Sequence, residues 1–220
     1  MALPTRALAD FMPMLLPNAP AVPWPVAEQA LRLSAVEFCE RTRCWRHITQ
    51  RSIRRRSNTI VTPDFAAIFE IENATLNGFP LEPTQFSDIA LGRDGDGGAA
   101  RYITQTGPDS VTVLPFEEGD LTLSLFLKPR SGSDGVVLSG YDDDIEDRAN
   151  VVPEFMFIQH AEAIVAGALS RVLKIPGQTY TNPPRGDEYM LLFERSVNNH
   201  FARNVRGQHR AAARSRPNYL

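Results

Sequence analysis

Cysteine is scarce in this chain: its 220 residues include only Cys39 and Cys44. On one continuous helix, side chains five residues apart point about 140° away from each other, so we expect neither a disulfide nor a shared metal between them. Free thiols fit a reducing compartment, and we expect synthesis and assembly in the cytoplasm. No apolar run approaches the roughly 18 residues of a membrane span. Asp10 and six prolines within residues 1–25 do not fit a signal peptide.

Motifs of the common enzyme classes are also missing. The sequence has no Gly-x-Ser-x-Gly, no phosphate-binding glycine loop that ends in lysine, and no His-Glu-x-x-His. Cys39 and His47 are a nucleophile and a base by type, but no third group marks an orienting partner, so we interpret Cys39 as a packed thiol. We therefore expect no catalytic residue, no cofactor and no enzymatic activity.

Two carboxylate-rich stretches are weak metal candidates. In Asp94-Gly-Asp-Gly-Gly, the third ligand position of a calcium loop falls on Gly98 and the twelfth residue is Gln105, so too few oxygens are available. In the stretch 142–147, the position that needs glycine is Asp147. We expect no metal site and interpret the second stretch as a solvated acidic edge.

The charge that is present is strongly segregated. A formal net charge of −3 conceals arginines at 51–56 and in the last 26 residues, and acidic residues at 142–147. From Arg195 onward there are six arginines and no Asp or Glu. Such a run fits phosphate contacts with nucleic acid, an acidic protein groove, or a solubilising tail without structure.

The hydrophobic periodicity changes twice along the chain. A period near 3.6 predicts helices at 26–45, 153–174 and 183–205, and alternation predicts strands over about 48–130, with turns at Asn77-Gly78 and Gly107-Pro108-Asp109. Residues 1–25 are expected to be extended. The predicted fold class is α+β: a small helical bundle, with one N-terminal and two C-terminal helices, an inserted antiparallel β-sheet and an extended C-terminal arm. We expect one domain at 26–197 and a basic docking arm at 198–220.

Several stretches carry a resemblance to a known family. They are VAEQALRLSAVEFCERTRCW (26–45), IENATLNGFPLEP (71–83), GPDSVTVLP (107–115), EAIVAGAL (162–169) and IPGQTYTNP (175–183). With the proline-rich start, this layout resembles the head-to-tail adaptor (connector, neck) proteins of tailed bacteriophages, of the type called tail tubular protein A in short-tailed phages. These stretches are architectural patterns and include no catalytic signature.

The resemblance implies a structural protein of the virion neck or tail region. Its partners would be the portal protein ring, neighbouring copies of itself in a ring of twelve, a downstream tail or nozzle protein, and genomic DNA passing through the lumen, with no membrane. A ring requires an interface that joins two unlike faces of each subunit. The portal-binding arm would comprise Phe201, Arg203, Arg206, Arg210, Arg214, Arg216 and Tyr219.

Two points stay open at the level of sequence. We hypothesise that an acidic loop faces the DNA channel, where negative charge lets DNA slide; its residues are Asp142, Asp143, Asp144, Glu146 and Asp147.

The alternative function is a basic-tailed nucleic-acid-binding or DNA-packaging accessory protein. Only Phe201 and Tyr219 flank the arginines, which disfavours stacking on single strands. Steep weakening by salt would distinguish DNA binding from docking through a packed helix.

Overall fold

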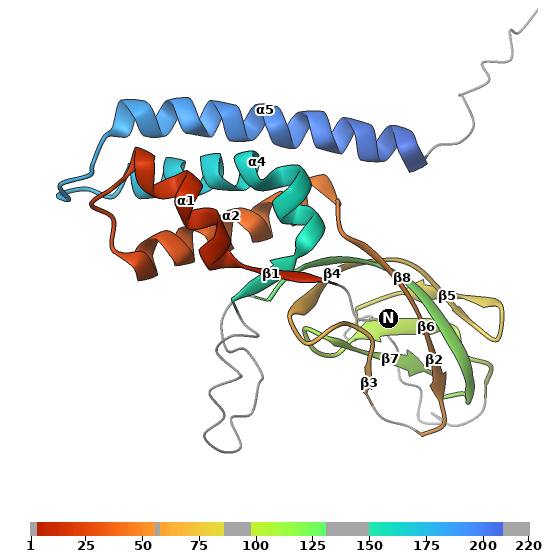
Figure 1. Cartoon of the computed structure of the whole chain (residues 1–220). Coiled ribbons are helices and arrows are strands. Elements are labelled where there is room, and N and C mark those ends of the chain that lie inside the picture. Colours follow the sequence, from red (N-terminus) through yellow and green to blue (C-terminus); the bar gives the residue numbers. More distant parts are fainter. Residues whose placement is uncertain (1–3, 56–57, 86–97, 131–149, 209–220) are drawn as a thin grey trace, which may run out of the picture.

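A computed structural model describes residues 4–55, 58–85, 98–130 and 150–208. Within these residues, a group of helices lies beside a strongly curled β-sheet (Figure 1). The long helix α5 (Pro183–Gln208) runs across the outer side of the helical group, with α4 (Glu154–Val172) and α2 (Trp24–Thr42) beneath it (Figure 1). One continuous hydrophobic core extends through both parts.

The long helices begin and end close to the expected ranges. Helix α2 spans Trp24–Thr42, α4 spans Glu154–Val172 and α5 spans Pro183–Gln208. Proline at the start of α2 and α5 suits a first turn, whose N–H groups have no partner within the helix. Helix α2 ends before Trp45 because Arg43 adopts a left-handed conformation, with φ 52°.

Among the described residues of the N-terminal segment, only three form a strand. Strand β1 (Thr5–Ala7) pairs antiparallel with β9 (Val151–Pro153). The chain then coils into the 3-10 turns η1 (Leu8–Phe11) and η2 (Leu16–Asn18) and the short helix α1 (Met12–Leu15) between them. These turns bury several apolar side chains, so hydrophobic burial overrides the extended preference of a proline-rich segment. The buried set includes Leu8, Phe11, Met12 and Leu15.

The large sheet contains seven strands in the order β2-β8-β4-β5-β6-β7-β3. The strands are β2 (Arg46–Ile53), β3 (Thr59–Ile60), β4 (Ala66–Leu76), β5 (Phe79–Pro83), β6 (Tyr102–Gln105), β7 (Ser110–Leu114) and β8 (Gly119–Pro129). The expected Asn77-Gly78 turn joins β4 to β5, and both residues have positive φ. Strands β5 and β6 pair in parallel, although the sheet was expected to be antiparallel throughout.

The predicted fold class, a small helical bundle with an inserted antiparallel sheet, is wrong. The described chain is strand-rich, and its seven-stranded sheet curls into a nearly closed barrel that accompanies a separate two-stranded sheet. Register shifts in β4, between Ile68 and Glu70 and between Ile71 and Asn73, bend the sheet against β8. Leu121, Leu123 and Leu125 alternate along β8 and are fully buried. The barrel therefore contributes its own part of the core.

The helices are held close together at one glycine. A Cβ added at Gly167 of α4 would lie 2.2 Å from the Ser34 Oγ of α2 and 2.8 Å from the Phe193 ring of α5. Ser34 donates a 2.7 Å hydrogen bond to the carbonyl of Ile164. Glycine is therefore required here because three helices meet at this point.

Candidate interaction surfaces

Helix α5 has one partnered face and one unpartnered face among the described residues. Gly186, Phe193 and Val197 are buried against the other helices. Leu191 and Leu192 remain 71 % and 51 % exposed. An apolar residue that is exposed singly needs no explanation, but two adjacent exposed leucines on one helix form a surface that another protein can bury.

Ion pairs fix the position of α5 along the helices beneath it. Arg41 of α2 contacts both carboxylate oxygens of Glu194, and the hydrogen bond from Arg41 lowers the pKa of the Glu194 carboxyl. At the start of α5, Lys174 pairs with Asp187 at 2.7 Å. Glu194 is the last acidic residue of the sequence, so every charged residue that follows it on α5 is basic.

The structure describes only part of the predicted docking arm. Phe201 lies on α5 and is 43 % exposed. Arg203 and Arg206 also lie on α5, which ends at Gln208, three residues beyond the expected helix end at 205, so the first part of the predicted docking arm at 198–220 is helical rather than extended. The remaining predicted positions lie outside the described residues: Arg210, Arg214, Arg216 and Tyr219 of the arm, and Asp142, Asp143, Asp144, Glu146 and Asp147 of the acidic loop. The stretch 94–97 of the weak calcium candidate lies outside them too.

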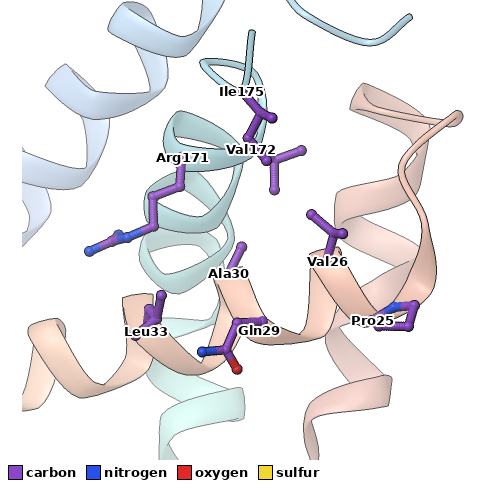
Figure 2. Close-up of a pocket in the computed structure, with 8 residues that line it drawn as sticks. All are labelled: Pro25, Val26, Gln29, Ala30, Leu33, Arg171, Val172 and Ile175. Carbon is purple, nitrogen blue, oxygen red and sulfur yellow. The ribbon is translucent and has the colours of Figure 1, made fainter. Parts of the chain in front are cut away.

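An apolar groove lies between the start of α2 and the end of α4 (Figure 2). Its volume is about 380 Å³, and it is lined by Pro25, Val26, Gln29, Ala30, Leu33, Arg171, Val172 and Ile175. Its two polar side chains are already engaged within the molecule, because Arg171 pairs with Glu37 and Gln29 accepts a hydrogen bond from Arg32. A small-molecule site normally offers several polar groups that orient the ligand. This groove is therefore better suited to apolar side chains of another protein.

Sequence reasoning missed the groove because its walls come from segments that are far apart in the chain. Leu33 is 41 % exposed on a helix whose other apolar residues are mostly buried. An exposed leucine outside the buried stripe of the 26–45 helix was the available signal. The position of Val172 and Ile175 opposite it depends on how α4 packs across α2, which periodicity does not determine.

Two histidines meet between α4 and α5. The rings of His160 and His200 lie 4.5 Å apart, and both pack on Phe38 of α2. Burial, and then the nearby charge of His200, lower the pKa of His160 to about 4. Nδ1 of His160 is buried without a hydrogen-bond partner. Among the described residues, no group of three or more His, Cys, Asp or Glu side chains is arranged to hold a metal ion.

The expected separation of Cys39 and Cys44 is wrong. Because α2 ends at Thr42, Cys44 does not continue the helix, and the two sulfur atoms lie 3.9 Å apart. The prediction failed because it assumed a continuous helix through residue 44.

A second basic surface lies on the barrel. Arg51 is the sixth residue of β2, and Arg54 and Arg55 follow the strand directly. All three side chains are exposed. They lie in the arginine-rich stretch 51–56 and are a candidate for phosphate contact.

Comparison with known proteins does not assign the chain to a family. The sequence matches no protein-family model and none of the curated proteins. In the part of the chain that the structure describes, no helix is long and apolar enough to cross a membrane.

Proposed function

We propose that this protein is a non-enzymatic structural adaptor of a tailed-phage virion, which joins the portal ring to the tail and continues the DNA channel. The observation that carries the proposal is the unpartnered side of α5. Exposed apolar side chains lie there, and the charged residues in the C-terminal part of the helix are all basic. A helix of this kind binds by laying its apolar residues into a groove of the partner. The portal surface that receives it would be apolar at its centre and acidic at its rim.

The exposed apolar residues of α5 point in different directions, which allows two contacts. Leu192 and Phe201 are nine residues apart and so differ by about 180° around the helix axis and by about 14 Å along it, while Leu191 lies between them around the axis, about 80° from Phe201. We assign Phe201, Arg203 and Arg206 to the portal. We assign Leu191 and Leu192 to the neighbouring copy in the ring.

The apolar groove is the matching half of that contact between copies. A closed ring needs two unlike faces on every subunit, one of which receives the other. The groove beside Leu33 is concave and apolar, and the Leu191–Leu192 pair is convex and apolar. Repetition of this contact around an axis gives the ring, for which the family resemblance implies twelve copies.

Charge neutralisation on α5 tests docking to the portal. The double variant Arg203→Gln/Arg206→Gln should weaken co-sedimentation with portal rings from the same source at least several-fold. The matched control is Arg54→Gln/Arg55→Gln, which removes the same charge from the barrel and should bind portal normally. Equal binding by both variants and the unaltered chain would remove Arg203 and Arg206 from the portal interface.

The same pair of variants tests the alternative, a nucleic-acid-binding or DNA-packaging accessory protein. The exposed arginines of the barrel favour this second function, because phosphate contacts need cations at the surface. Under it, duplex DNA would be bound with an affinity that falls steeply with salt, and Arg54→Gln/Arg55→Gln would reduce that affinity. Under the adaptor proposal, neither variant changes the weak, nonspecific retention of DNA by more than about twofold, since retention spreads over many charges.

A further inference from the structure

The end of α2 brings the two cysteines of the chain into contact. Arg43 has a left-handed backbone, and its N–H donates a 2.8 Å hydrogen bond to the carbonyl of Cys39. This cap turns the chain back over the last helical turn, so that the Sγ atom of Cys44 lies 3.9 Å from that of Cys39. A side-chain contact between these two positions commonly accompanies such a cap.

The two thiols differ in accessibility and acidity. Cys39 is 1 % exposed, and its sulfur lies 3.7 Å from the Sδ atom of Met156 in α4. Cys44 is half-buried. Burial raises the pKa of Cys39, whereas the hydrogen bond between the two thiols lowers the pKa of Cys44. A partly exposed thiol with a lowered pKa, in contact with a buried thiol, is the arrangement of an attacking and a resolving cysteine.

We propose that Cys44 is a hydroperoxide-sensitive thiol and that Cys39 resolves it into an intramolecular disulfide. The Cys44 thiolate attacks hydrogen peroxide, the O–O bond breaks, and Cys44 sulfenic acid and hydroxide form. The Cys39 sulfur then attacks the sulfenic sulfur, the S–O bond breaks, and water leaves with the thiol proton. In total, two thiols lose two electrons and one peroxide is reduced to two waters.

The local geometry permits this closure. A disulfide requires a sulfur separation near 2.05 Å, so the two atoms must approach by about 2 Å. Cys44 lies beyond the last residue of α2, so its movement breaks no hydrogen bond within the helix. The bond would fasten the end of α2 to the start of β2. Trp45, the next residue, stacks on Phe65 and accepts a 2.8 Å hydrogen bond from the N–H of Leu127.

Peptide mapping of the full-length protein tests the proposal. The reduced protein is treated with hydrogen peroxide, its remaining thiols are alkylated, and it is digested with trypsin. Cleavage after Arg41 and Arg43 places the two cysteines on separate peptides, 33–41 and 44–46. We expect these peptides to stay linked, the protein to stay monomeric on a non-reducing gel, and Tm to rise by about 5 °C. Separately alkylated peptides, oxidation without linkage, or links between chains would overturn the proposal.

Two single variants assign the roles of the thiols. In Cys39→Ser, sulfenic acid should persist on Cys44 and be trapped by dimedone. In Cys44→Ser, the buried Cys39 should remain unlabelled under the same conditions. Labelling of Cys39 alone would contradict the assigned roles. The peptide readout on the unaltered chain does not depend on either variant folding, and none of these outcomes depends on the adaptor function.

Discussion

Arg41 and Glu194 join the end of α2 to the middle of α5 through two hydrogen bonds, from Nη1 to Oε1 at 2.6 Å and from Nη2 to Oε2 at 2.5 Å. The Arg41 guanidinium also lies 6.0 Å from the centroid of the Phe193 ring, which is fully buried. Arg41 thus contacts both the exposed carboxylate of Glu194 and the buried ring of Phe193, which are neighbours on α5. This contact fixes which part of α5 is covered and which part is free to bind a partner.

The Arg41–Glu194 pair should make part of the stability dependent on acid. Because the pKa of Glu194 is lowered in the folded chain, the stabilisation is fully present above the ordinary carboxyl pKa and is lost as pH falls through the lowered value. Glu194→Gln should cost at most about 1 kcal/mol at neutral pH, since the pair is one-third exposed. Urea denaturation of both proteins from neutral pH down to acid measures this. A cost that stays constant below the carboxyl pKa would contradict it.

His160 should destabilise the fold in mildly acidic solution. Its pKa is about 4 in the folded chain and about 6.5 when unfolded, so the unfolded chain takes up the proton first as pH falls. Stability is therefore full above about pH 6.5 and declines towards pH 4, by on the order of 1 kcal/mol per unit. His160→Phe should flatten that decline, while His200, which faces His160, is unchanged. Denaturation curves that keep the original slope in the variant would contradict the assignment.

Gly167→Ala should destabilise the protein by about 1–3 kcal/mol, because the new methyl group overlaps Ser34 and Phe193. At an exposed site in a helix interior, the same substitution stabilises a protein by roughly 1 kcal/mol. The sign of the measured stability change therefore shows whether the methyl group meets the predicted overlap. Adding Ser34→Ala removes the nearest atom and should recover part of the loss in a double-mutant cycle. Additive costs in urea denaturation would mean that Ser34 is not the obstacle.

The ring contact predicts a pattern of complementation between two variants. Leu33→Glu places a charge in the groove, and Leu191→Glu places one on α5, so neither variant alone should form rings with portal. Each keeps one intact face, so a mixture should form heterodimers that do not grow, as measured by sedimentation velocity. Ile48→Glu, at a 69 % exposed position on β2, is the matched control and should assemble normally. Ring formation by either interface variant alone would rule out this contact.

The sequence located the long helices and the hairpin turns, because those features depend on neighbours within a few residues. It did not predict the barrel, because the pairing of β2 with β8 and the bend at Ile68 and Glu70 depend on distant contacts. The contact between Cys39 and Cys44 was missed because one left-handed residue, Arg43, redirected the chain. The sequence is enough to propose Phe201 for docking. The groove beside Leu33 could not be predicted, because it depends on how α4 packs against α2.

Sedimentation velocity of the purified chain, alone and mixed with portal rings from the same source, tests the central claim most directly. We expect co-sedimentation near one copy per portal subunit, retained at high salt because Phe201 of α5 is buried at the contact. Deletion of 201–220, which keeps Phe193, Val197 and His200, should abolish it and leave a folded protein. Failure to co-sediment, together with a salt-sensitive shift on duplex DNA, would contradict the adaptor function and favour a nucleic-acid-binding protein.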